Sequence, residues 1–538
     1  MSARISGACV GALGLTLALA VADPAAARDC ASVAATPVAG AEITASLQPA
    51  GPFQIPAELG PMTTVDLPAF CRVRGVLRPS KDSQIAFELW LPAENWNGRF
   101  QGVGNGGFAG TIPYAGLAAA LRSGNAAAAS DTGHAAGVTD AKWAQGHPQK
   151  VVDFGWRAVH RTAVVGKALT KTYYGTAPRN AYFVSCSNGG RQGLMEAQRF
   201  PLDYDGIIAG APAYHWTALF TGFVWNAQQL AKPGATIPGA KASAIASAVL
   251  AQCDKLDGLA DGLVSDPRQC HFGADALRCT GAETGACLTD PQIAALNAIY
   301  QGPRTPDGRR IYFGFPPGGE TAPESPGWDM WIFGAAPGAS IQNAFGTNFV
   351  KYIVGATEGW TPAQFDFGRD FDSLRSRTAA TFDATDPDLS RFAAHGGKLI
   401  LFHGWSDAAI PAEGTIAYRD AVTRKMGAVR TQSFLRLFLV PGMHHCAGGV
   451  GPSEFGQNGP SRENEDAATS LTAALQAWVE KGRAPEQVTA SQATDPVIPA
   501  GAAPRTGLIC AYPRRAELLP DGNPLHAESY RCGARNPD

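Results

Sequence analysis

Ser187, Asp407 and His445 carry the groups that a serine hydrolase needs: a hydroxyl, a carboxylate and an imidazole. Ser187 lies between a short apolar stretch at 181–184 and a stretch with helical spacing at 191–199. Such a strand-to-helix turn exposes the hydroxyl at a helix N-terminus, which stabilises developing negative charge. The segment 185–189 (Ser-Cys-Ser-Asn-Gly) replaces the first glycine of the usual Gly-x-Ser-x-Gly turn with another small residue. By itself, this segment also fits a turn with a purely structural use.

An acid and a base follow Ser187 in the order that this chemistry requires. Asp407 ends a turn after the apolar segment 398–402, and His445 lies in the loop after the apolar segment 435–440. Each has a simpler explanation, since capping aspartates and loop histidines are common. Their joint placement after successive strands predicts a triad in which His445 is the base and Asp407 orients it. The adjacent His444 is the rival for the base.

Two cysteines flank this predicted triad. Cys186 directly precedes Ser187, Cys446 directly follows His445, and 260 residues separate the two cysteines. A disulfide holds its two Cα atoms about 5.5–6 Å apart, so this bond would bring the hydroxyl and the imidazole within reach of each other. We therefore predict a Cys186–Cys446 disulfide that fixes the site.

The other cysteines indicate a disulfide framework. The chain has 11 cysteines, and the ten beyond Cys9 form an even number. In an exported chain this count favours five disulfides. Four cysteines must pair over longer distances: Cys30, Cys71, Cys186 and Cys446. Sequence proximity suggests three further bonds: Cys253–Cys270, Cys279–Cys287 and Cys510–Cys532.

The N-terminus predicts export. Arg4 precedes an apolar stretch at 8–22, and small residues at 25–27 precede Arg28, which is the layout of a signal peptide (1–27) cleaved after Ala27. No later stretch reaches the roughly 18 apolar residues that span a bilayer. We expect a secreted or periplasmic protein without a membrane anchor. A net charge of −2, without a run of Lys or Arg, argues against nucleic acid as a partner, and the sequence leaves the oligomeric state open.

Strands and helices alternate in two blocks of the chain. This alternation is typical of an α/β fold with a mostly parallel sheet. Between the blocks, residues 214–390 contain helices, cysteine loops and connections rich in Pro, Gly and aromatic residues. We expect a core built from 28–213 and 391–538, with 214–390 inserted as a lid domain. The expected strands are 85–92, 98–104, 181–184, 206–209, 398–402 and 435–440, and the expected helices are 153–174, 191–199, 412–425 and 464–481.

The pairs Cys186-Ser187 and His445-Cys446, with Asp407, resemble the CS-D-HC signature of the tannase and feruloyl esterase family, which includes enzymes that cleave mono(2-hydroxyethyl) terephthalate. Segments 186–193, 210–213, 403–407 and 442–446 also resemble blocks of that family, so the resemblance covers nearly the whole mature chain. It implies an α/β-hydrolase core with a large inserted lid domain. It further implies a Cys30–Cys71 disulfide, and His445 as the base.

The predicted reaction needs two backbone N–H donors for the oxyanion that forms on the attacked carbonyl. Asn188, the residue after the nucleophile, would supply one. The Gly-rich loop 104–110 would supply the other, from Gly106 or Gly107.

An acidic loop at 253–263 suggests a metal site. Calcium prefers clusters of oxygen ligands, although the spacing here is not that of an EF-hand, and a solvated acidic turn is the alternative. The loop resembles the structural calcium loop of the family's lid, and the role implied is to order the lid. No organic cofactor is expected. The ligands that the resemblance implies are the side chains of Asp254, Asp257 and Asp261 and the carbonyls of Leu259 and Leu263.

Aromatic residues of the lid are candidates for contact with a planar acyl ring, although each also fits an ordinary lid core. We single out Trp216, and His403 from its position in a family block. The expected activity is feruloyl esterase-like hydrolysis of small aromatic esters, with tannase or mono(2-hydroxyethyl) terephthalate hydrolase activity as alternatives. The full set of lid candidates is Trp216, Phe220, Trp328, Trp331, Phe333 and Phe345.

Three other interpretations compete. A cysteine hydrolase using Cys186 is disfavoured because an oxidising compartment would convert the thiol to a disulfide. A zinc site at residues 444–446 is disfavoured because three consecutive residues rarely converge on one metal. A catalytically inactive hydrolase-fold binding protein is disfavoured because Ser187, Asp407 and His445 are all present.

Overall fold

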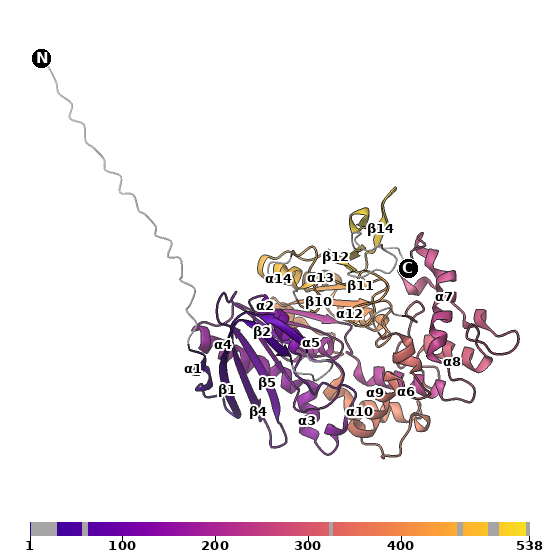
Figure 1. Cartoon of the computed structure of the whole chain (residues 1–538), viewed down its shortest axis with the longest axis horizontal. Coiled ribbons are helices and arrows are strands. Elements are labelled where there is room, and N and C mark those ends of the chain that lie inside the picture. Colours follow the sequence, from indigo (N-terminus) through magenta and orange to yellow (C-terminus); the bar gives the residue numbers. More distant parts are fainter. Residues whose placement is uncertain (2–28, 56–62, 322–325, 460–465, 493–504, 534–538) are drawn as a thin grey trace.

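A nine-stranded mixed sheet forms the centre of the molecule (Figure 1). The computed structural model describes residues 1, 29–55, 63–321, 326–459, 466–492 and 505–533, so the expected signal peptide lies outside the described residues apart from Met1. The first four strands in spatial order pair antiparallel, and from the fourth strand onward all pairs are parallel. In spatial order the strands are β1 (Ala41–Gln48), β4 (Phe70–Leu77), β5 (Ile85–Pro92), β7 (Ala126–Ser130), β6 (Arg99–Val103), β8 (Asn180–Cys186), β9 (Gly206–Gly210), β10 (Lys398–Gly404) and β11 (Leu435–Val440).

Helices cover both faces of this sheet. Successive side chains of a strand point to opposite faces, and in β8 Phe183 packs in one core while Tyr182 and Val184 pack in another. Strands β7 and β9 are buried along their whole length, because parallel strands under two helical layers are apolar on both sides. One layer contains α4 (Ala158–Tyr174), α5 (Asn188–Arg199) and α12 (Ala412–Met426), and the other contains α2 (Tyr114–Arg122) and α14 (Leu471–Lys481).

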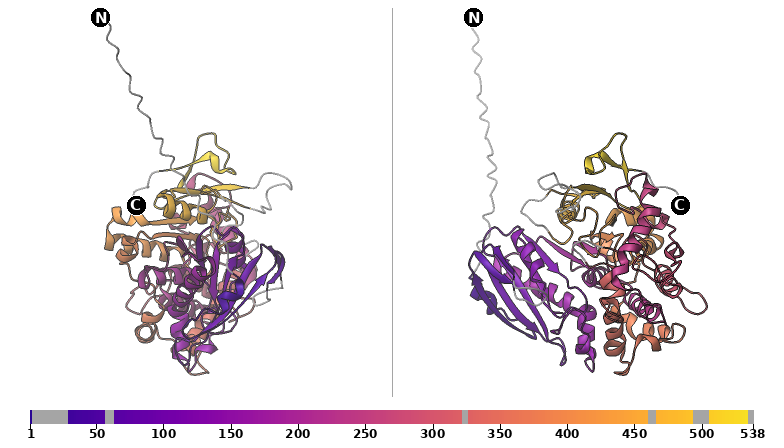
Figure 2. Two further views of the ribbon diagram at one scale, coloured as in Figure 1. Left: turned by 90° about the vertical axis from the view of Figure 1, so that its left-hand side faces the viewer. Right: turned by 45° about the vertical axis from the view of Figure 1, so that its right-hand side comes forward.

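The stretch between β9 and β10 is helical and has its own hydrophobic core. Within its described part it contributes no strand to the central sheet. Figures 1 and 2 show its helices gathered at one side of the sheet. Its main elements are α6 (Trp216–Leu230), α7 (Ala242–Cys253), α8 (Asp290–Gln301), α9 (Ile341–Asn348) and α10 (Asp370–Phe382), with the π-helical turns η7 (Asp329–Phe333) and η8 (Phe349–Val354).

Short elements and disulfides complete the fold. The last helix, α14, begins at Leu471 rather than at 464, because the Ser470 side chain caps it by accepting the Ala473 N–H. The short helices are α1 (Cys30–Ala34), α3 (Pro148–Val152), α11 (Ser390–Ala394) and α13 (Ala428–Phe434), and the strand pairs are β2 (Gly51–Ile55) with β3 (Thr63–Leu67), β12 (Gln487–Ser491) with β13 (Thr506–Cys510), and β14 (Ala516–Leu518) with β15 (Tyr530–Cys532). The five disulfides are Cys30–Cys71, Cys186–Cys446, Cys253–Cys270, Cys279–Cys287 and Cys510–Cys532.

Candidate active site

Ser187 occupies a sharp turn between β8 and α5. Its φ of 65° and ψ of −127° lie in a region that L-residues rarely adopt, so the surrounding structure must hold it there. The Ser187 N–H donates to the Gly210 carbonyl at 2.9 Å. A Cβ atom at Gly190 would lie 2.3 Å from the same carbonyl oxygen, so only glycine lets α5 start this close to β9. The turn therefore presents the hydroxyl at the carboxyl end of the parallel strands.

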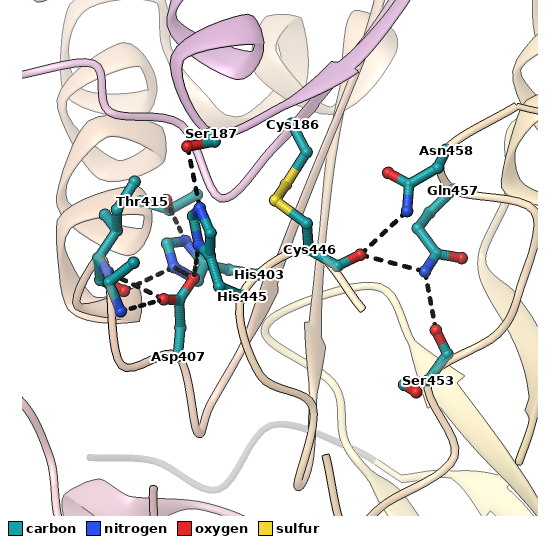
Figure 3. The surroundings of a disulfide bond; sticks show 12 residues. Cys186, Ser187, His403, Asp407, Thr415, His445, Cys446, Ser453, Gln457 and Asn458 are labelled. Atoms are coloured by element: carbon teal, nitrogen blue, oxygen red, sulfur yellow. Dashed lines mark hydrogen bonds and ion pairs between the residues drawn. A yellow bond between two sulfur atoms is a disulfide. The ribbon is translucent and has the colours of Figure 1, made fainter. Parts of the chain in front are cut away.

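Ser187, His445 and Asp407 form one hydrogen-bonded chain (Figure 3). The His445 Nε2 atom lies 2.9 Å from Ser187 Oγ, and its Nδ1 atom lies 2.8 Å from Asp407 Oδ2. The other oxygen of Asp407 accepts the backbone N–H groups of Ala409 and Ile410 at 2.8 and 2.9 Å. These bonds fix the carboxylate, and the carboxylate in turn fixes the imidazole.

The disulfide Cys186–Cys446 joins the two segments that carry Ser187 and His445 (Figure 3). Its Cα atoms lie 5.9 Å apart. Cys446 adopts a φ of 70°, and its carbonyl accepts hydrogen bonds from the side chains of Gln457 and Asn458. The histidine loop is thus held on both sides, by sulfur to the serine turn and by amides to the following loop.

Asn188, Gly106 and Gly107, the residues expected to stabilise the oxyanion, all line the cavity beside Ser187. Asn188 is the first residue of α5, and the N–H at that position has no acceptor within the helix. Gly106 and Gly107 also line the cavity, and neither amide donates to any residue that the structure describes. A Cβ atom at Gly107 would lie 2.5 Å from the Val138 carbonyl oxygen, so a larger residue would not fit. The three residues expected to supply the oxyanion donors therefore line the same cavity as Ser187.

A cavity of about 640 Å³ opens beside the hydroxyl of Ser187. Helix α6 lines it with Trp216, Phe220 and Phe223, which share one face of the helix. Among the described residues that line the cavity, none is an Asp, Glu, Lys or Arg. A cavity of this size and character suits a small, largely apolar ligand.

Two more aromatic residues from the segment between β9 and β10 line the cavity. The rings of Trp331 and Phe345 lie 6.2 Å apart and are parallel to within 9°. The Trp331 ring also lies 5.6 Å from the His445 ring, so the lid reaches the hydrogen-bonded chain itself. Of the remaining candidates, Trp328 and Phe333 are buried in the lid core and do not line the cavity.

Comparison with known proteins decides the family. The family model described as tannase and feruloyl esterase matches residues 71–533. This chain belongs to the tannase and feruloyl esterase family.

Members of this family resemble the chain over most of its length. An uncharacterized esterase of Xanthomonas campestris pv. campestris is 42% identical, with 97% of this chain and 93% of the relative covered. The probable feruloyl esterase B-2 of Aspergillus flavus is 34% identical, with 81% of each chain covered. The crystal structure of feruloyl esterase B from Aspergillus oryzae is 28% identical and matches with a TM-score of 0.83, covering 94% of this chain and 100% of that one. The predicted α/β-hydrolase fold is confirmed, and the protein is a carboxylic ester hydrolase.

The structure does not place His403 in the cavity of this esterase, contrary to the expectation from sequence. The ring is fully buried, with Nδ1 at 2.7 Å from Thr415 Oγ1 and Nε2 at 2.9 Å from the Ile410 carbonyl. Its Nε2 atom also lies 3.2 Å from Asp407 Oδ2. Burial alone would raise the pKa of Asp407, but the His445 and His403 imidazoles outweigh it and hold that pKa well below its usual range. His403 therefore contacts Asp407 outside the cavity and favours its ionised form.

His444 points away from the hydrogen-bonded chain. It is fully buried, and its Nε2 atom lies 3.0 Å from the Thr321 carbonyl. Burial lowers the pKa of His444 to about 4. The neighbouring His445 is the one that contacts both Ser187 and Asp407.

In the acidic loop 253–263, the aspartate side chains accept hydrogen bonds from backbone N–H groups of the same loop. Asp254 Oδ1 accepts the N–H groups of Asp261 and Gly262, and Asp257 Oδ1 accepts that of Leu259. Asp261 Oδ1 accepts from Leu263, and its Oδ2 atom accepts from the Arg505 guanidinium at 2.6 Å. The structure does not bring one oxygen from each of these three carboxylates within 4.8 Å of the others, and Asp261 is paired with Arg505.

A different acidic cluster lies between α4 and the end of α5. One ligand atom each from His160, Glu196 and Asp203 lies within 4.8 Å of the others, and His160 Nδ1 is 2.6 Å from Asp203 Oδ2. Burial and the neighbouring Asp203 raise the pKa of Glu196 well above its usual value.

Several cavity residues escaped the sequence reasoning. Leu219 and Phe223 lie three and seven residues after Trp216, on the same face of a helix. Applying this helical spacing to Trp216 would have predicted both. Ala409 and Ile410 also line the cavity, directly after the acid. No sequence signal marked those two, because their place depends on how the lid covers the turn.

Proposed function

We propose that this enzyme hydrolyses esters of aromatic acids, of the hydroxycinnamic type, through an acyl-enzyme on Ser187. The observation that carries the proposal is that the His445 imidazole bonds both Ser187 Oγ and Asp407 at the edge of an aromatic cavity. The relatives support the same substrate class, since one is named a probable feruloyl esterase of Aspergillus flavus and another is feruloyl esterase B from Aspergillus oryzae.

In the proposed mechanism, His445 Nε2 takes the Ser187 proton while Oγ attacks the ester carbonyl. The backbone N–H groups of Asn188 and of Gly106 or Gly107 stabilise the resulting oxyanion. His445 then gives its proton to the leaving alcohol, and the carbonyl re-forms as an acyl ester of Ser187. Water, deprotonated by the same imidazole, repeats the attack and releases the acid. Asp407 keeps the proton of His445 on Nδ1 throughout.

The cavity supports an aromatic acyl group as the specificity element. Trp216, Phe220 and Trp331 offer ring faces and edges to a planar acid. A free second carboxylate, as in a terephthalate monoester, would lose its hydration without gaining a cation from any described lining residue. We therefore place cinnamate-type esters ahead of terephthalate monoesters.

Hydrolysis of methyl ferulate, methyl gallate and mono(2-hydroxyethyl) terephthalate tests the proposal. Wild type is expected to act on methyl ferulate, and Ser187→Ala to lose at least about 1000-fold in kcat. Ser247→Ala, on the exposed face of α7, is the matched control and should behave as wild type. A Ser187→Ala variant with wild-type turnover would refute the mechanism, and a wild type inactive on all three esters would refute the substrate class.

We also propose that Ca²⁺ binds the loop 253–263 and orders the lid. The chemistry of the loop supports this proposal, because Asp254, Asp257 and Asp261 supply three carboxylates within eight residues, together with carbonyls of Leu259 and Leu263. Bound calcium would link these oxygens and take no part in catalysis. We expect Ca²⁺ to raise the Tm of chelator-treated protein, Mg²⁺ to do so less, and Asp257→Asn to abolish the shift. Equal Tm values with and without Ca²⁺ would contradict this assignment.

Export and the lid boundaries are further parts of the proposal. Five disulfides suit an oxidising compartment, and no helix in the described part of the chain is long and apolar enough to span a bilayer. We propose cleavage after Ala27, a lid domain at 214–390 and a core from the flanking segments. Intact mass from the native host, before and after reduction, is expected to show a chain that starts at Arg28 and lacks free thiols.

A further inference from the structure

Arg191 is a fully buried cation in the first turn of α5. It lies four residues after Ser187, and its exposed fraction is 0%. No described residue forms a salt bridge with it, but the Asp383 carboxylate, which accepts two hydrogen bonds from Thr217, attracts the guanidinium from a greater distance. A cation at a helix N-terminus opposes the helix dipole, and an unpaired buried charge is costly. Burial and the helix dipole therefore disfavour this placement, and the attraction of the Asp383 carboxylate offsets them only in part.

Neutral oxygens bind the guanidinium from three parts of the fold. Its Nε atom donates to Asn188 Oδ1 at 2.8 Å. Its Nη1 atom donates to the carbonyls of Gly155 at 2.8 Å and Phe382 at 3.4 Å, and Nη2 donates to that of Phe154 at 3.2 Å. Phe154 and Gly155 belong to the π-helical turn η2 (Asp153–Arg157), and Phe382 ends the lid helix α10. One side chain thus joins the serine turn, the core and the lid.

Aromatic rings keep water away from this charge. The guanidinium carbon lies 5.0 Å from the ring centroid of Trp216 and 5.2 Å from that of Phe154. Trp216 in turn lines the cavity, so the cation stands directly behind the cavity wall. Burial lowers the pKa of Arg191 to about 9, which still leaves it charged at neutral pH. A charge in such surroundings is screened much less than one at the surface.

We propose that Arg191 is a positioning residue for the oxyanion site: it fixes Asn188 and places a permanent positive charge behind the serine turn. This inference rests on the proposed acyl-enzyme mechanism, in which the Asn188 N–H receives the oxyanion. The negative charge exists only while the carbonyl is tetrahedral. Arg191 is attracted to the Asp383 carboxylate throughout the reaction and gains a second negative charge only in the transition state, and such a differential interaction raises kcat.

Two substitutions separate the charge from the hydrogen bonds. Arg191→Lys keeps the charge, whereas Arg191→Gln keeps a donor for Asn188 Oδ1 and removes the charge. We expect Gln to lower kcat on methyl ferulate about 30-fold and Lys to lower it less than about 10-fold, with KM changed less than about threefold. Tm measured for each variant shows that it is folded.

The affinities of two inhibitors distinguish an electrostatic role of Arg191 from a purely structural one. Phenylboronic acid forms an anionic tetrahedral adduct with the serine hydroxyl, whereas cinnamamide is a neutral analogue of the ground state. We expect Arg191→Gln to weaken phenylboronic acid by the same factor as kcat and to leave cinnamamide unchanged. Equal kcat values for the Lys and Gln variants would overturn the charge role, and an effect on KM alone would assign Arg191 to the cavity wall.

Asn188→Ala provides the test if Arg191→Gln does not fold. It cuts the bond from Arg191 Nε while keeping the cation, and we expect a roughly tenfold loss in kcat with a parallel loss of boronic acid affinity. Unchanged kcat in this variant would overturn the positioning role. Hydrolysis of p-nitrophenyl acetate by wild type distinguishes a failure of the proposed substrate class from a failure of the Arg191 role. If wild type hydrolyses p-nitrophenyl acetate but not methyl ferulate, the aromatic substrate class is refuted, and the Arg191 variants can still be compared on p-nitrophenyl acetate.

Discussion

Removing the Cys186–Cys446 disulfide with the double variant Cys186→Ala/Cys446→Ala is expected to weaken both stability and catalysis. The bond closes a loop of 260 residues, whereas Cys279–Cys287 in the lid closes one of 8. In the chain-entropy model these loops correspond to roughly 5.5 and 2.5 kcal/mol of unfolding free energy. A chain of 538 residues unfolds with an entropy of about 1 kcal/mol per degree, so the expected losses in Tm are roughly 5 °C and 2 °C.

Catalysis should separate the two disulfides more sharply than stability does. Cys446 is adjacent to His445, and a shift of the imidazole by about 1 Å can cost about 100-fold in rate. We expect kcat/KM on methyl ferulate to fall about 100-fold in the Cys186/Cys446 variant and to stay at the wild-type value in Cys279→Ala/Cys287→Ala, the matched control. Scanning calorimetry and initial rates on both variants provide the measurement. If the two variants keep the same kcat/KM, the disulfide does not position the site.

The remaining predictions concern charge. Asp407→Asn should lower kcat about 10⁴-fold, because Nδ1 of His445 loses its anionic acceptor, and a loss under tenfold would argue against Asp407 as the acid. Dimethyl terephthalate should be hydrolysed at least about 100-fold faster than monomethyl terephthalate, as measured by kcat/KM, since the described lining offers no cation to a free carboxylate. Burial raises the pKa of Glu320 from 4.5 to about 7. The neutral carboxyl group therefore favours the folded state, and the free energy of unfolding decreases as Glu320 ionises between pH 4.5 and about 7. Glu320→Gln should therefore raise Tm by a few degrees at pH 8 and not at pH 4, and an equal change at both pH values would show that titration of Glu320 is not the cause.

The sequence determined the chemistry and the order of the elements. Short apolar runs and helical spacing are local signals, so the strands at 85–92 and 435–440 were predicted with their bounds. The order Ser187, Asp407, His445 and the two flanking cysteines named the hydrogen-bonded chain, since each residue follows the end of a predicted strand. A disulfide between distant cysteines is itself a statement about tertiary distance, which is why the sequence could bring the serine and the imidazole together.

Tertiary structure alone decided which side chains meet the substrate cavity. His403 and Trp216 were both expected there, but His403 lies behind Asp407 and only Trp216 lines the cavity. Nothing in the local sequence separates these cases, because the direction of a side chain depends on how the lid packs over the sheet. The role inferred for Arg191 has the same origin: its partners are backbone carbonyls of Phe154, Gly155 and Phe382, which are distant in sequence and carry no residue-type signal.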